Sequence, residues 1–305
     1  DDTGFPKKGK GSVCVARQYS GTLGKIGNCQ IGVSLNCATN DGCFPLDFQL
    51  YMPEEWANDL KRRAKAGIPL ETDFKTKWQI SLDMIDQAIS WEIPQGVIVT
   101  DAGYGVASDF RAKLRERKLE YIVGIQNQNN FWRETVELTQ KATGRPRKWP
   151  SVSPESALEL AKNLPQEAWV EVSWRKGTKG PLKGKFTAIR VWPACGRRQG
   201  KEIEPICWLL IEWSPDEKDS YSFWLSNLPE NTPLQELVYW AKIRWYIEQN
   251  YQQLKDELGL DHFEGRSWMG WHHHVTLVMI AFNFLVLEGF RVKKNYWVWL
   301  DSPAS

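Results

Sequence analysis

The sequence predicts an α/β protein in which a mixed sheet is flanked by helices and interrupted by a β-rich insertion subdomain. Three observations lead to this fold class: successive strand-like segments near the start, a strand–turn–helix–strand segment after them, and a proline-punctuated middle that separates both from late helices. The 305 residues are 42% hydrophobic and 25% charged. This composition is typical of globular proteins and argues against disorder.

The first part of the chain contains three short strand-like segments, of which the first two carry β-branched residues and the third alternates apolar and polar positions before Pro53. They are "SVCVARQYS" (12–20), "CQIGVSLNCAT" (29–39) and "CFPLDFQLYMP" (43–53). Three such segments in succession predict an antiparallel meander. A helix is expected next over residues 75–91, where Trp78, Leu82, Ile85 and Ile89 recur at helical spacing before Pro94.

Residues 96–126 have the order of a parallel strand pair. The apolar run "GVIVTDAGYG" ends in Asp101 and a glycine-rich turn, a helix-like segment follows over 107–119, and a second apolar run, "YIVGIQ", comes last. This order places Asp101 at the carboxyl end of its strand. Sites in open α/β sheets are usually built at that end.

The middle of the chain reads as an inserted subdomain. Short β-like pieces such as "WVEVSW", "FTAIRVW" and "CWLLIEW" alternate there with prolines. Residues 175–201 contain nine Lys and Arg and no Asp or Glu, although the whole chain has a net charge of only +2. We therefore expect three parts: residues 1–126 and 222–305 form a core, and residues 127–221 form a basic β-rich insertion.

One long helix is predicted for the segment after the insertion. Asn231 or Thr232 would be its N-cap, with Pro233 at the first helical position and Gly259 at the end. Arg244, Glu248 and Lys255 follow each other at i, i+4 and i+11, so they would share one helix face. By itself this pattern also fits a solvated charge ladder.

Three groups of acids could together hold a hard divalent cation. They are the Asp1–Asp2 pair at an early strand, Asp101 at a strand end, and Glu248 on the late helix. Mg²⁺ prefers oxygen ligands and keeps several waters, so two or three carboxylates suffice. Each Asp alone is weak evidence, because an Asp at a strand end is often only a turn former.

The chain resembles the DDE transposases of bacterial insertion sequences, the cut-and-paste kind with an RNase H-like catalytic core. Three stretches carry the resemblance, in this order: "DDTGFPKKGKGSVCVARQYSGTLGKIGNCQIGVSL", "VIVTDAGYG" and "RWYIEQNYQQLKDELGLDHFEGRSW". It covers nearly the whole chain and is weakest in the proline-rich middle. The order and spacing of the three blocks make it more specific than any single motif.

The resemblance implies a catalytic triad of Asp1, Asp101 and Glu248, with Asp2 as the alternative to Asp1. These acids would bind Mg²⁺, or Mn²⁺ in its place, for DNA strand cleavage and then strand transfer. The family signature Y-x2-R-x3-E-x6-K falls on Arg244, Glu248 and Lys255. Ala241 stands where the family has its tyrosine.

The resemblance also implies DNA as the partner, both the terminal inverted repeats of the element and the target, bound by a homodimer. Trp174, Trp192 and Phe186 interleave with the basic run and could stack on an unpaired base. Basic side chains near the acids and in the insertion are the expected phosphate contacts. They are Arg244, Lys255, Lys7, Lys8, Arg175, Lys176, Lys179, Lys183, Lys185, Arg197 and Arg198.

Two other functions stay open at this point. The chain could be a different RNase H-like DNA nuclease, such as a junction resolvase, or a DNA-binding relic of a decayed transposase. The basic insertion favours the transposase, and the presence of all three acids argues against decay.

Other features of the chain predict a cytoplasmic protein. Its six cysteines form no C-x-x-C pair and are expected to be free thiols. The apolar run from Val275 to Leu287 is shorter than the roughly 20 residues that a bilayer requires, so a buried helix is expected. The chain opens on Asp1 rather than Met, which suggests a piece of a longer polypeptide.

Overall fold

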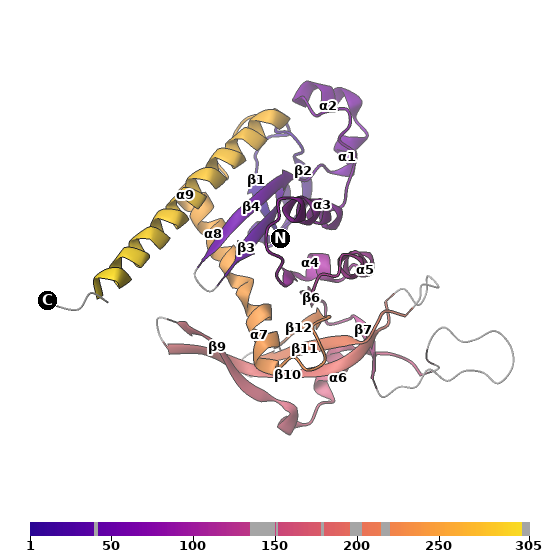
Figure 1. Ribbon diagram of the computed structural model, residues 1–305. Helices are drawn as coiled ribbons and strands as arrows, with labels where there is room; N and C mark the ends of the chain where they lie inside the picture. Colours follow the sequence, from indigo (N-terminus) through magenta and orange to yellow (C-terminus); the bar gives the residue numbers. More distant parts are fainter. Residues whose placement is uncertain are drawn as a thin grey trace. The chain divides into compact units, whose positions relative to one another are not determined.

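The computed structural model divides into two compact units, which are described one at a time (Figure 1). It describes residues 1–39, 42–134, 150, 152–177, 180–195, 203–214 and 220–300, with the side chains of 293–300 excepted. Unit 1 consists of Asp1–Ile93 and Trp245–Ser305, and unit 2 of Pro94–Arg244. The three-part division into 1–126, 127–221 and 222–305 stays a prediction, because compactness does not test which segments act together.

Unit 1 contains an antiparallel four-stranded sheet built around one long strand. Its strands are β1 (Asp2–Pro6), β2 (Ala16–Ser20), β3 (Lys25–Ala38) and β4 (Cys43–Leu50). On one side, β3 pairs with β1, and on the other it pairs with β2 along its first part and with β4 along its second. The predicted meander is confirmed by the β2–β3 and β3–β4 pairings, and a 3₁₀ turn, η1 (Gly21–Leu23), separates β2 from β3.

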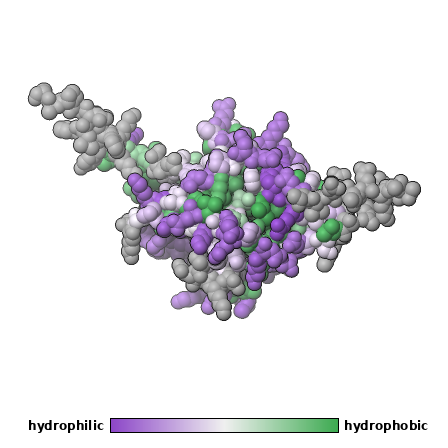
Figure 2. Space-filling view, turned by 90° about the horizontal axis from the view of Figure 1, so that it is seen from below, coloured by the Kyte–Doolittle hydropathy of each residue, from purple (hydrophilic) through white to green (hydrophobic). Residues whose placement is uncertain are grey.

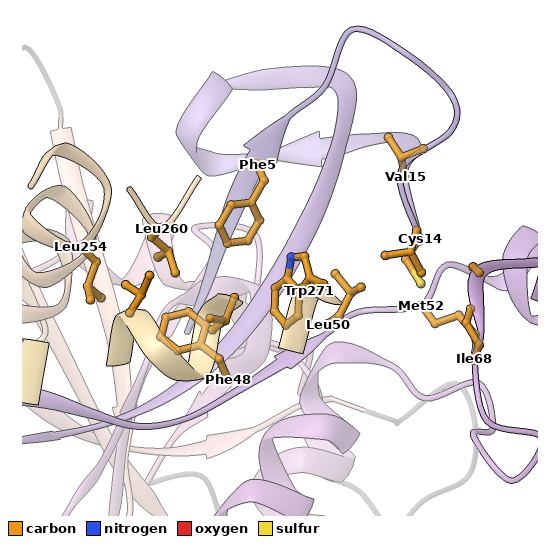
Figure 3. Close-up of a cluster of buried hydrophobic side chains, with 14 of the residues drawn as sticks. Phe5, Cys14, Val15, Phe48, Leu50, Met52, Ile68, Leu254, Leu260 and Trp271 are labelled. Carbon is orange, nitrogen blue, oxygen red and sulfur yellow. The ribbon is translucent and has the colours of Figure 1, made fainter. Parts of the chain in front are cut away.

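The helices of unit 1 come from both ends of the chain. They are α1 (Glu54–Ala57), α2 (Leu60–Ala66), α3 (Lys77–Ser90), α8 (Trp245–Asp256) and α9 (Trp268–Leu300). The predicted helix over 75–91 is confirmed as α3, which starts with a capping box between Thr76 and Gln79. Early strands and late helices share one apolar core, in which Phe5, Phe48 and Leu50 pack with Leu254 and Trp271 (Figure 3).

Helix α9 is longer than the apolar run suggested. Residues Trp268–Val292 are long and apolar enough to cross a membrane by length and composition, and only 17% of the most apolar window is buried. The prediction of a buried helix is wrong for most of this run, because only one face of α9, with Trp271, Val275 and Phe282, enters the core. Apolar side chains on the other face, such as Leu277 and Ile280, are exposed. A core helix of a soluble protein meets the same length and composition criteria, so they are weak evidence for a membrane span.

Unit 2 is built on a mixed sheet. Along the sheet the strands run β5 (Ile98–Thr100), β6 (Tyr121–Ile125), β12 (Ser220–Ser226), β11 (Cys207–Ser214), β10 (Gly180–Pro193), β7 (Asn130–Arg133) and β8 (Glu155–Ser156), and β9 (Val170–Gly177) also pairs with β10. The predicted parallel pair is confirmed as β5 and β6. The other pairings of this sheet are antiparallel among the described residues, so the strands of the expected insertion continue the sheet that β5 and β6 begin.

The helices of unit 2 are α4 (Ala102–Gly105), α5 (Ser108–Glu116), α6 (Ala157–Lys162) and α7 (Leu234–Ile243), with a 3₁₀ turn, η2 (Gln166–Ala168). Leu237, Val238 and Ala241 of α7 pack onto Phe186 and Leu210 of the sheet. A mixed sheet with helices packed on it confirms the predicted α/β fold class, which is consistent with an RNase H-like fold.

The cysteines allow a test of this fold. All six are free, and burial raises the pKa of Cys43 and that of Cys207 to about 12, which keeps both thiols protonated at pH 8. Because the thiolate is the reactive form, titration with dithiobis-nitrobenzoate at pH 8 should label the half-buried Cys37 and Cys195 first. The four buried thiols should react only after unfolding in denaturant. Fast labelling of more than two thiols in the native protein would contradict the packing described.

Candidate active site

Strand β1 presents its two acids to opposite faces of the sheet. Side chains alternate along a strand, so Asp1, Thr3 and Phe5 share one face while Asp2 lies on the other. Phe5 packs on Trp271 of α9, with ring centroids 5.9 Å apart. On the opposite face, the Asp2 carboxylate accepts a 3.0 Å hydrogen bond from Lys77 of α3. Asp1 therefore faces the α9 side of the sheet, and Asp2 faces α3.

Asp1 continues the pairing of β1 with β3. Its amino group donates to the Ser34 carbonyl at 3.0 Å, and the Ser34 amide donates to the Asp1 carbonyl at 2.8 Å. The residue is buried, and its Oδ1 accepts a 2.9 Å hydrogen bond from the Asp2 amide. Both the backbone and one carboxylate oxygen of Asp1 are thus held in place by neighbouring backbone groups.

Helix α8 packs on the face of the sheet to which Asp1 belongs. Tyr251 shares a 2.6 Å hydrogen bond with the Ser34 hydroxyl, and the Lys255 ammonium donates to the Gly4 carbonyl at 3.1 Å. Glu248 lies three residues before Tyr251 and seven before Lys255, so all three side chains lie on the same side of α8. The helix that carries Glu248 is therefore held on the side of the sheet that Asp1 faces.

The pKa of Lys255 depends on the burial of its ammonium group and on nearby carboxylates. Partial burial lowers the pKa of its ammonium group, and the carboxylates of Asp261, Glu248 and Asp256 oppose that shift. Glu248 itself is exposed. It is thus an accessible carboxylate with a partly buried cation on the same side of its helix.

Asp101 lies in unit 2, directly after β5, where it caps α4. Its Oδ1 accepts a 2.9 Å hydrogen bond from the Gly103 amide, and Nη2 of Arg244 lies 3.9 Å from its Oδ2. The predicted position at the carboxyl end of a strand is confirmed. A Cβ added at Gly105 would lie 1.9 Å from the Gly124 carbonyl oxygen of β6, so only glycine allows α4 to approach β6 this closely.

The single helix predicted after the insertion is wrong. Helix α7 begins after Pro233, its N-cap, and ends at Ile243, and α8 starts at Trp245, with Arg244 as the C-cap between them. Arg244 therefore does not share a helix with Glu248, because α7 ends just before Arg244 and α8 starts just after it. Ala241, at the position of the family tyrosine, is 4% exposed and packs in the core of unit 2, where its small side chain fits.

Comparison with known proteins shows the family of the chain. The family model described as DDE superfamily endonuclease matches residues 1–181, more than half of the chain. The chain belongs to the DDE superfamily endonucleases. The resemblance noted in the sequence is thereby confirmed.

A curated relative extends the match. The chain is 26% identical over 266 residues to the probable transposase for insertion sequence element IS701 of Microchaete diplosiphon, which covers 86% of this chain and 58% of the relative. Any stretch of that length includes both Asp101 and Glu248, although the family model ends before Glu248. The chain spans little more than half the length of this relative.

The basic residues near the start of this DDE endonuclease chain differ in accessibility. Lys8 is exposed. The Lys7 side chain is only 3% exposed, and its ammonium group donates to the Phe263 carbonyl and contacts Glu264 at 3.4 Å. Lys7 therefore ties the start of the chain to the loop before α9, and its charge is not presented at the surface.

Four of the basic residues expected to contact DNA lie on the β9–β10 ribbon in the described part of the insertion. Lys176 is exposed, Lys183 pairs with Glu171 at 2.9 Å, and the Lys185 ammonium lies 4.7 Å from the centroid of the Trp213 ring. Arg175 is half-buried. The face of the molecule in Figure 2 carries many hydrophilic side chains around a smaller hydrophobic area. Lys179, Arg197 and Arg198 lie outside the described residues.

Two of the three aromatic residues expected to stack on a base are packed inside unit 2. Phe186 is fully buried, and Trp174 meets it edge-on with ring centroids 5.6 Å apart. The Lys242 ammonium lies 4.8 Å from the Trp174 centroid and 2.6 Å from the Glu212 carboxylate. Trp192 is partly buried. The contacts of Lys242 with Glu212 and Trp174 were not predicted from the sequence, because no local pattern links these residues.

The carboxylates suit a hard divalent cation in chemistry and in number. Among the described residues, no group of three or more His, Cys, Asp or Glu forms a complete cluster that could hold a metal ion. Unit 1 contributes Asp1 and Glu248, and unit 2 contributes Asp101. Oxygen ligands of this kind match Mg²⁺, which takes few protein ligands and keeps its waters.

The close approach of α4 to β6 can be tested by Gly105→Ala. The added methyl group would meet the Gly124 carbonyl, so we expect a loss of about 2–3 kcal/mol in the free energy of unfolding, measured in denaturant. Gly96→Ala is the matched control, because a Cβ there meets nothing within 4 Å. Equal stability of the two variants would show that α4 and β6 are further apart than described.

Proposed function

We propose that this chain is the catalytic part of an insertion-sequence transposase, which cleaves DNA strands at the element ends and joins them to target DNA. The observation that carries the proposal is the arrangement of Asp1 and the Glu248 helix on one side of the unit 1 sheet, in a member of the DDE endonuclease family. The similarity to a probable insertion-sequence transposase supports the same reaction.

Asp1, Asp101 and Glu248 are the proposed metal ligands, and Asp1 is preferred over Asp2. Asp1 lies on the sheet face that packs on α8, whereas Asp2 lies on the other face and pairs with Lys77. Bound Mg²⁺, or Mn²⁺ in its place, would lower the pKa of a bound water and stabilise charge on the phosphate oxygens. Asp1 and Glu248 belong to unit 1, and Asp101 belongs to unit 2.

Arg244 and Lys255 are proposed as cations that act beside these acids. Nη2 of Arg244 lies 3.9 Å from Oδ2 of Asp101, within ion-pair range, and a guanidinium binds a phosphate as a planar fork. Lys255 lies near enough to Glu248 for their charges to interact, and its ammonium holds the backbone of β1 at Gly4. Both cations would offset negative charge that develops during phosphodiester cleavage.

The DNA backbone is proposed to contact the basic ribbon of β9 and β10 and the exposed Lys8. Arg175, Lys176, Lys183 and Lys185 lie on the part of the ribbon where β9 and β10 pair. Cations along a strand pair attract a phosphate backbone without reading its sequence. We further propose that the chain acts in the cytoplasm, as a homodimer on the terminal inverted repeats and the target.

The reaction can be tested with Glu248→Gln. Purified protein is mixed with supercoiled donor DNA that carries the terminal repeats, with Mg²⁺, and nicked and joined products are counted. Loss of one metal ligand should reduce cleavage about 10³-fold or more, while DNA affinity in a gel shift stays roughly unchanged. Glu257→Gln, an exposed acid just beyond α8, is the matched control and should cleave normally.

The same assay, run in parallel on branched DNA, separates the functions left open by the sequence. Cleavage of branched DNA without joining would indicate a resolvase. DNA binding without any cleavage by the unmodified chain would indicate a relic. Full activity of Glu248→Gln would remove Glu248 from the metal site.

The choice between the first two acids gives a separate prediction. Asp1→Asn should abolish Mg²⁺-dependent cleavage. Asp2→Asn should retain most of it, because it removes a partly exposed ion pair with Lys77, worth about 1 kcal/mol or less. Initial cleavage rates at saturating Mg²⁺ measure both effects, and the reverse order of activities would assign the catalytic role to Asp2.

A further inference from the structure

We infer that Tyr251 is a positioning residue, whose hydroxyl fixes the Glu248 helix against the strand that pairs with Asp1. This inference rests on the proposed function, because it concerns two of the proposed metal ligands. Tyr251 lies outside the family signature that maps onto Arg244, Glu248 and Lys255. It would not touch metal or DNA, and its effect would act through Ser34.

An unbroken series of hydrogen bonds connects α8 with Asp1. The Tyr251 hydroxyl and the Ser34 hydroxyl lie 2.6 Å apart in a buried contact. The Ser34 backbone exchanges hydrogen bonds of 3.0 and 2.8 Å with the backbone of Asp1. The Asn36 amide donates to the Ser34 hydroxyl at 2.8 Å, which holds that hydroxyl in position.

Packing alone does not require the Tyr251 hydroxyl. The ring is 6% exposed and lies in the apolar core of unit 1, where it meets Phe48 at 6.3 Å in an edge-on contact. A phenylalanine would fill the same space. A buried hydroxyl costs free energy unless it is hydrogen-bonded, so its partner Ser34 restricts where α8 can lie.

The position of α8 matters because Glu248 lies near the start of this helix. The helix starts at Trp245, directly after Arg244, so Glu248 lies in its first turn. Tyr251 follows Glu248 by three residues, about one turn. A metal ligand must be held to within about 0.5 Å, and one hydrogen bond this close to Glu248 limits both sliding and rotation of the helix.

The test is the affinity of the chain for Mn²⁺, measured without DNA by following the electron paramagnetic resonance signal of the free ion. Tyr251→Phe should weaken binding about tenfold, the effect typical of residues that orient a metal ligand. Ser34→Ala should weaken it by a similar factor. The double variant should bind no worse than Ser34→Ala alone, because both changes remove the bond between Tyr251 and Ser34, and only Ser34→Ala also removes the acceptor of the Asn36 amide.

Tyr121→Phe is the matched control. This tyrosine is also buried, and its hydroxyl accepts a 3.0 Å hydrogen bond from Arg115, but it lies in unit 2 and outside the proposed site. Its loss should lower the melting temperature by a few degrees, as in Tyr251→Phe, and leave Mn²⁺ affinity unchanged. A merely structural role for Tyr251 would give the two variants the same Mn²⁺ affinity, which would overturn the inference.

Glu248→Gln in the same titration separates this inference from the proposed function. If Glu248→Gln binds Mn²⁺ as tightly as the unmodified chain, the proposed metal site fails, and the inference fails with it. If Glu248→Gln loses the ion and Tyr251→Phe keeps it, the metal site stands and only the role of Tyr251 is overturned. Weaker binding in both supports both.

Discussion

Unit 1 depends on the close packing of its sheet against α8 and α9, and the contact between Phe5 and Trp271 is the centre of that packing. The two rings meet edge-on, with an interplanar angle of 87°. Gly32 of β3 makes room for them, since a Cβ there would lie 2.9 Å from the Phe5 ring and 3.3 Å from Trp271. With the sheet and helices this close, Tyr251 reaches Ser34 and Lys255 reaches the backbone of β1.

In unit 2, a partly buried ion pair between Lys242 and Glu212 holds the end of α7 on the sheet. The Lys242 ammonium lies 2.6 Å from both oxygens of Glu212 and is surrounded by Trp174, Phe186 and Trp224. Partial burial of an ion pair is costly, and the aromatic faces around the cation offset part of that cost. The pair fixes the helix end two residues before Arg244, the residue that reaches Asp101.

Local patterns in the sequence predicted the elements well and their ends less well. The parallel pair of β5 and β6 and the place of Asp101 followed from strand periodicity and a glycine-rich turn, both of which are local. The break at Arg244 could not be predicted, because apolar residues continue at helical spacing from α7 into α8. The spacing of Arg244 and Glu248 therefore predicted a shared helix face that the backbone does not form.

The site residues show the same limit. Alternation along β1 could have separated Asp1 from Asp2 only if the sequence told which face packs on α8 and α9, and that depends on Trp271 from the far end of the chain. Lys7 resembled a loop lysine, but its partners at Phe263 and Glu264 are equally distant. The sequence likewise suggested that the Phe186 ring was accessible to a base. The ring is buried by residues from other strands and from α7, which are distant in the sequence.

The discontinuity of unit 1 has a consequence for how the protein is made on the ribosome. Unit 2 is one uninterrupted stretch, Pro94–Arg244, and can fold as soon as it has been synthesised. Strands β1 to β4 emerge earlier, but their apolar face must wait for α8 and α9, as the 217-residue separation of Ser34 and Tyr251 illustrates. During translation those strands expose Phe5, Phe48 and Leu50 to solvent, and we expect chaperones that bind nascent chains to bind there.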